Sequence, residues 1–179
     1  MAGISFTVTL EDAVPRLALA RMGEAMDDMT ELMDGVGRAL VNSGVERIIS
    51  TNTDPDGAAW TPSRRVREHG GRTLHLSGLL GNSLTHQAAA DHVVVGSNLI
   101  YAAVMHEGAE QGAFGAAIGR TRPTEKRPRS QDYFTPLPWG DIPARRYLAT
   151  AAGGISEEDE LTIGDLVEVH FGSVVEGLQ

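Results

Sequence analysis

Residues 74–108 read LHLSGLLGNSLTHQAAADHVVVGSNLIYAAVMHEG, and this stretch decides the fold. An apolar run that ends near Leu84 is followed by the short link 88–91 and then by the β-branched run 93–95, which Gly96 ends. Two apolar runs joined by a short polar link are typical of an antiparallel hairpin. The stretch therefore predicts two paired strands at the centre of the fold.

The period of the apolar residues changes after this hairpin. Over residues 99–106 they recur three to four positions apart, which predicts a short helix with Ser97 or Asn98 as its N-cap. Gly108 follows in the position where glycine commonly stops a helix. Three residues of this unit are expected to be buried: Leu84, Val94 and Tyr101.

The N-terminal part predicts one strand and one long helix. Residues 4–10 alternate strictly between apolar and polar types, as a strand does. From about residue 12 to 50, apolar residues then recur at a helical spacing close to a heptad. A continuous helix of that length would measure roughly 57 Å at about 1.5 Å per residue. Because a domain of 179 residues cannot bury such a helix along its whole length, part of it should lie on another subunit or project.

Residues 108–141 predict an extended loop arm, rich in Gly, Ala, Pro and Arg. Loops of this length are usually functional or disordered, and this one is expected to become ordered on a partner. Its basic residues, with two arginines that follow it, form the candidate partner-binding set: Arg120, Arg122, Lys126, Arg127, Arg129, Arg145 and Arg146.

A final helix is predicted after Ser156, which can cap it. Residues 157–160 are all acidic and would occupy its first turn, where the helix dipole favours negative charge. The fold class is therefore α+β: a long N-terminal helix, a small antiparallel sheet with a short helix, a long basic loop and a C-terminal helix. Residues 1–179 are expected to form a single domain.

Composition excludes several classes of protein. The chain has no cysteine, so disulfides and thiolate metal sites are excluded. Its N-terminus lacks the features of a signal peptide, and no apolar run approaches the roughly 20 residues that a membrane-spanning helix needs. We therefore expect a soluble protein without a membrane partner.

The net charge of −9 is strongly segregated along the chain. Residues 1–59 carry −6, residues 60–146 carry +4, and residues 147–179 carry −7 with neither Lys nor Arg. Two interpretations stay open. The acidic ends are either solvated helix faces or surfaces that attract the basic middle of another copy or of an unlike neighbour.

Motifs for chemistry are weak. The stretch from Asn52 to Gly57 partly matches a calcium loop, but Ser63 stands where the bidentate glutamate is needed and Pro55 stiffens the turn. His106-Glu107 lacks the second histidine of a zinc-protease helix, and no serine lies in a nucleophile elbow. The sequence therefore predicts neither an enzyme nor a bound cofactor or metal.

Four motifs in order carry a family resemblance. They are 54–57 (DPDG) with Trp60, 76–84 (LSGLLGNSL), 94–97 (VVGS) with 101–102 and 106–108, and 142–148 (IPARRYL). Together, over roughly residues 52–150, they resemble the phage virion morphogenesis family, which includes the Mu-like morphogenesis proteins and the tail-completion proteins of contractile-tailed phages.

The resemblance implies a structural virion protein at the head-proximal end of a phage or phage-like tail. It would complete the tail, or join it to the head, as a subunit of a homo-oligomeric, hexameric ring. Implied partners are the tail tube or terminator and head-neck connector proteins, with DNA passing through the channel. The protein would be made in the host cytoplasm and reside in the virion tail or neck. An alternative from another class is a nucleic-acid-binding accessory protein that uses the basic middle segment.

Overall fold

The computed structural model describes residues 13–120, 132–138 and 140–176, so the strand expected over 4–10 lies outside the described residues. The elements follow in the order α1 (Ala13–Asp27), α2 (Thr30–Glu46), the π-helix η1 (Arg47–Thr51), α3 (Arg64–His69), α4 (Leu79–Asn82), β1 (Leu84–Ala88), β2 (Val93–Ser97), α5 (Ala102–Glu107), β3 (Ala116–Arg120), β4 (Asp132–Pro136) and α6 (Glu157–Glu176). This confirms the α+β class.

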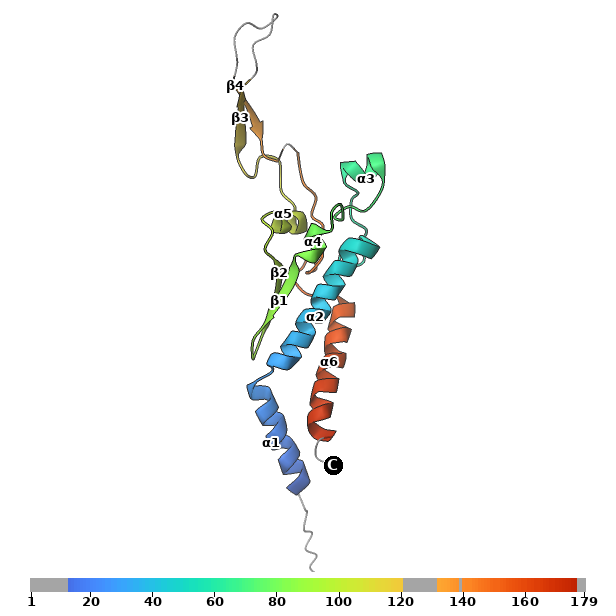
Figure 1. The fold of residues 1–179 in the computed structure, drawn as a ribbon, viewed down its shortest axis with the longest axis vertical. Coiled ribbons are helices and arrows are strands. Elements are labelled where there is room, and N and C mark those ends of the chain that lie inside the picture. Colours follow the sequence, from blue (N-terminus) through green and yellow to red (C-terminus); the bar gives the residue numbers. More distant parts are fainter. Residues whose placement is uncertain (1–12, 121–131, 139, 177–179) are drawn as a thin grey trace, which may run out of the picture.

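The molecule is elongated, with α2 at its centre (Figure 1). One side of α2 packs on β1 and β2, and another side packs on α6. Helices α1 and α6 extend to one end of the molecule, whereas β3 and β4 project from the opposite end. The two ends are therefore built from different elements.

The predicted helix over 12–50 is not continuous, which corrects that expectation. Asp28 and Met29 separate α1 from α2. The Asp28 carboxylate accepts a hydrogen bond from the Thr30 backbone N–H at 3.0 Å, and the Met29 N–H donates to the Ala90 carbonyl at 3.1 Å. A short acidic side chain competes in this way with helical hydrogen bonding. The second helix then runs into η1 and ends at Asn52, which has the left-handed φ of 56°.

The core lies between the α2–η1 helix, the β1–β2 hairpin and the segment around residue 147. Its buried side chains are Ile48, Trp60, Leu80, Leu84, Ala102 and Tyr147. The two polar aromatic side chains in it have partners, since the Trp60 indole donates to the Arg146 carbonyl and the Tyr147 hydroxyl to the Ala102 carbonyl, both at 3.1 Å. Burial raises the pKa of Tyr147 to about 12, with a smaller contribution from Tyr101.

Close approach of α2 to β1 depends on Gly37. A Cβ at this position would lie 2.4 Å from Cδ2 of His86 on β1, a distance that no packed pair of carbons tolerates. His86 lies beside it and its Nε2 is 2.8 Å from the Asp34 carboxylate of the same helix. Gly37, a residue unfavourable inside a helix, is therefore required here by packing.

The central hairpin is confirmed, but two of its expected core residues are not buried. Strands β1 and β2 pair antiparallel with Leu84 opposite Ser97 and Gln87 opposite Val94. Leu84 is buried, as expected, whereas Val94 is 59% exposed and Tyr101 is also exposed. Only one face of this two-stranded sheet is covered by α2, so alternate residues, including Gln87 and Val94, face solvent.

The short helix forms later than expected and without the expected cap. Helix α5 begins at Ala102, and the Ser97 hydroxyl accepts from the Leu99 N–H at 3.1 Å, which fixes the turn before the helix. Gly108 ends the helix with a φ of 78°, as predicted. The C-terminal helix α6 is confirmed, and its predicted cap Ser156 accepts from the Asp159 N–H at 3.1 Å.

The expected loop arm over 108–141 contains a second antiparallel hairpin, which is a further correction. Strands β3 and β4 pair with Ile118 opposite Phe134. Ala109 and Ile142 exchange backbone hydrogen bonds of 2.9 and 2.7 Å and close the base of this segment against the body. The strand residues Ala116–Arg120 have little β-branched or aromatic content, so their sequence gave no strong strand signal.

Candidate partner-binding surfaces

The β3–β4 hairpin, here called the distal hairpin, exposes apolar side chains. Ile118 and Phe134 lie directly opposite each other and are 70% and 72% exposed. Phe114, just before β3, and Tyr133 on the other face are exposed as well. In Figure 1 the hairpin stands clear of the helices of its own chain. Contiguous exposed apolar side chains of this kind mark interaction surfaces.

The structure does not bring the predicted basic set together. Arg120 lies at the end of β3, where its Nε and Nη2 donate to the two carboxylate oxygens of Asp132 at 2.6 and 3.2 Å. Arg145 and Arg146 instead belong to the body of the molecule, near α5. Four members of the set lie outside the described residues: Arg122, Lys126, Arg127 and Arg129.

Arg146 has a structural role. Its Nη2 donates to the Glu107 carboxylate at 3.4 Å, and its backbone carbonyl accepts a hydrogen bond from the Trp60 indole N–H. Arg145 is different, because it is buried and its Nε donates to a backbone carbonyl, that of Thr61, at 3.1 Å. Of the three described members of the set, Arg145 is thus the buried one.

The opposite end of the molecule, formed by α1 and α6 and here called the helical end, is acidic and partly apolar. On α6 the exposed acids are Glu157, Glu158, Glu160, Asp165 and Glu168. Exposed apolar side chains accompany them, namely Leu17, Leu19 and Met26 on α1 and Leu161 and Val169 on α6. Both ends therefore expose apolar surface, and the helical end is acidic, whereas the described strands of the distal hairpin carry one arginine and one aspartate that pair with each other.

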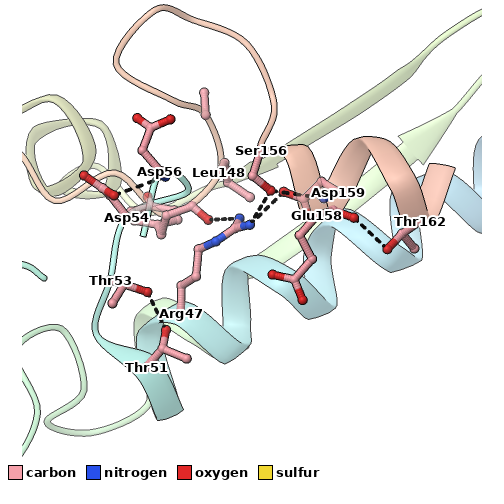
Figure 2. A network of polar contacts seen from close by, with 12 residues as sticks. Arg47, Thr51, Thr53, Asp54, Asp56, Leu148, Ser156, Glu158, Asp159 and Thr162 are labelled. Carbon is pink, nitrogen blue, oxygen red and sulfur yellow. Dashed lines mark hydrogen bonds and ion pairs between the residues drawn. The ribbon is translucent and has the colours of Figure 1, made fainter. Parts of the chain in front are cut away.

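A buried ion pair fixes the start of α6 to the body (Figure 2). Arg47 of η1 donates from Nη2 to the Asp159 carboxylate at 2.8 Å and to the Ser156 hydroxyl at 2.9 Å, and from Nη1 to the Tyr147 carbonyl at 3.3 Å. Burial raises the pKa of Asp159. However, hydrogen bonds from Ser43, Arg47 and Ser156, and the Arg47 charge, outweigh this effect and hold that pKa below its ordinary value.

Sequence reasoning missed this network. Arg47 and Asp159 are 112 positions apart, and an arginine on an amphipathic helix gives no sign of a buried partner. The only available signal was the spacing of Ser156 and Asp159, which is that of a helix cap. The network positions the acidic first turn of α6 and thus the helical end.

The partial calcium loop is an ordinary turn. Asp54 Oδ1 accepts from the backbone N–H groups of Asp56 and Ala58 at 3.1 and 2.8 Å, so this carboxylate already stabilises the chain (Figure 2 shows Asp54 and Asp56 beside the Arg47 network). Within the described ranges, no three His, Asp or Glu side chains converge as a metal ion would require.

The histidine of the His106-Glu107 pair is also structural. Its Nε2 accepts from the backbone N–H groups of Leu148 and Ala149 at 3.4 and 3.3 Å, so the ring proton is on Nδ1, which donates to Glu107 at 2.8 Å. This hydrogen bond lowers the pKa of Glu107. The imidazole therefore connects α5 to the segment that holds Tyr147.

Comparison with known proteins identifies the family. No curated protein and no solved structure matches the chain. In the part of the chain that the structure describes, no helix is both long and apolar enough to cross a bilayer. The model of the phage virion morphogenesis family matches residues 10–172, which is most of the chain. The chain therefore belongs to the phage virion morphogenesis family, with a structural role in the phage virion.

Proposed function

We propose that this protein is a ring subunit at the head-proximal end of a phage or phage-like tail, where it completes the tail or joins it to the head. Its role in this proposal is structural and not catalytic. The ring contains six copies, to match the symmetry of phage tails. Tail tube or terminator proteins and head-neck connector proteins are its neighbours.

The observation that carries the proposal is the distal hairpin. An isolated two-stranded hairpin is marginally stable in water and needs a further strand or a packed helix. Among the described residues, neither a further strand nor a helix covers Ile118 and Phe134, since both are exposed. A surface of this kind is stabilised when another subunit covers it.

The geometry supports contact between unlike ends of successive copies. The distal hairpin and the helical end lie at opposite ends of the molecule (Figure 1). The segment that contains the hairpin is net basic, whereas α6 belongs to a segment with seven acids and neither Lys nor Arg. Joining unlike surfaces head to tail produces a closed ring when the rotation between copies closes.

Native mass spectrometry of the purified protein tests this assembly. The double variant Ile118→Ser with Phe134→Ser should remain folded but monomeric, because both side chains are exposed in the single chain. Val94→Ser, at an exposed valine of the other hairpin, is the matched control and should assemble like the wild type. A double variant that still forms complete rings would contradict the proposal.

A second candidate function is binding of nucleic acid by the basic middle segment. Arg64, Arg67 and Arg72 are exposed in or just after α3, and residues 60–146 carry +4. Affinity for duplex DNA should then fall steeply with salt, because bound phosphates release counterions. Salt-dependent binding by a protein that remains monomeric in the particle would favour this function over the ring.

A further inference from the structure

A groove of about 500 Å³ lies beside α3, near the base of the distal hairpin. Its lining includes Arg64 and Arg67 of α3, and Ile142 and Pro143 after the distal hairpin. Arg145 lines the groove as well. We call this feature the Arg145 groove.

Arg145 is a buried cation that has no carboxylate partner among the described residues. It is 6% exposed, and its Nε donates to the Thr61 carbonyl. Within the described residues no ion pair includes its guanidinium, and burial lowers its pKa. The other buried arginine, Arg47, is 7% exposed and has three acceptors, one of them a carboxylate. Since a buried charge is costly unless paired, the two arginines call for different explanations.

Arg145 is one of the residues that line the groove, so its guanidinium can serve a ligand there. Among the described residues, His170 Nε2 is the fully buried side-chain polar atom that has no partner. Within the described residues, Nη1 and Nη2 of Arg145 have no hydrogen bond and are not among the fully buried atoms without a partner, so some solvent reaches them. A guanidinium that presents its two terminal nitrogens matches a carboxylate in a bidentate pair.

The lining favours a carboxylate of a protein over a nucleic-acid backbone. Leu74, Met105 and Pro143 make much of the surface apolar. Arg64 is already paired with Glu68 at 2.7 Å, and Asp141 adds a negative charge on the rim. A phosphate backbone is usually held by rows of exposed cations, whereas one deep guanidinium among apolar side chains suits an acidic side chain next to an apolar one.

We infer that the Arg145 groove binds a carboxylate of α6 from a second copy of this chain. Helix α6 offers exposed acids beside exposed apolar residues, as Glu157 and Glu160 lie near Leu161. Its segment is the most acidic in the chain and has no basic residue to repel the groove. The inference rests on the proposed ring and names one contact between neighbouring copies. The groove lies near the base of the distal hairpin, and both would contact the same neighbouring copy.

Complementation between two variants tests the contact. The groove variant, Arg67→Glu with Arg145→Gln, keeps α6 intact. The α6 variant, Glu157→Lys with Glu160→Lys, keeps the groove intact. Each alone should associate roughly thirtyfold more weakly or worse, the loss expected when one member of a desolvated charge pair is removed. Mixed at equal concentration they should form a one-to-one heterodimer, because one intact groove then meets one intact α6.

Native mass spectrometry is the readout, with wild-type assembly as the reference. Arg67→Glu alone serves if the double variant does not fold, since Arg67 is exposed. Arg38→Glu, on exposed α2 surface, has the same charge change as Arg67→Glu alone; it is the control and should assemble normally. Groove variants that assemble like wild type would overturn the inference but would not contradict the proposed ring. Groove variants that lose DNA binding and still assemble would have the same consequence. A wild-type chain that stays monomeric would refute the ring itself.

Discussion

Removal of the Asp159 carboxylate should strongly destabilise the protein. The pair with Arg47 has side-chain exposures of 8% and 5% and an N–O distance of 2.8 Å. Asp159→Ala leaves the Arg47 guanidinium buried with only the Ser156 hydroxyl and the Tyr147 carbonyl. Loss of one partner of a buried pair costs about 3–5 kcal/mol. For a domain of this size each kcal/mol lowers Tm by roughly 2–4 °C, so a drop of roughly 6–20 °C is expected.

Urea unfolding at pH 7, followed by circular dichroism, measures this cost. Asp165→Ala, at an exposed acid of the same helix, is the control and should change the free energy of unfolding by about 0.5 kcal/mol or less. The double variant Arg47→Met with Asp159→Leu should be more stable than Asp159→Ala, because no charge is left buried. A cost below about 1 kcal/mol for Asp159→Ala would refute the argument that this pair fixes α6.

Three further predictions concern the fold. Val94→Asp should cost less than about 1 kcal/mol in urea unfolding, because Val94 is largely exposed; a loss of several kcal/mol would show that this face is covered. Gly108→Ala should cost more than about 1 kcal/mol, since its φ is 78° and its Cβ would lie 2.5 Å from the Ile142 carbonyl oxygen; an unchanged Tm would contradict this. The lowered pKa of Asp159 stabilises the fold above its unfolded value of about 4, and this contribution is lost as pH falls through the folded pKa. Asp159→Asn should therefore flatten the acid limb of a stability–pH curve, and an unaltered slope would contradict that assignment.

Local sequence patterns predicted the elements that depend on neighbouring residues. The hairpin of β1 and β2 follows from two apolar runs and a short link. Gly108 predicts where α5 ends, and Ser156 predicts where α6 begins. The break between α1 and α2 was missed because the heptad spacing continues through it. The break is fixed by the Asp28 side chain and by the hydrogen bond from Met29 to Ala90. Because these two residues are 61 positions apart, no local pattern indicates their contact.

The candidate site could be predicted only in part, for the same reason. Arg145 was identified from its place in a motif, but its burial and its hydrogen bond to the Thr61 carbonyl depend on the fold. The Arg47 network joins three distant segments and has no local signature. The sequence predicts a loop in place of the distal hairpin, because the Gly and Ala content of β3 hides the pairing of Ile118 with Phe134.

The location of the protein in the assembled particle tests the central claim most directly. Cryo-electron microscopy of particles that carry a tagged copy of this chain would show where it resides. The account predicts a ring of density at the head-proximal end of the tail, with the β3–β4 hairpin of each copy against α6 of the next. Density elsewhere in the virion, or a single copy without a repeated neighbour, would contradict it.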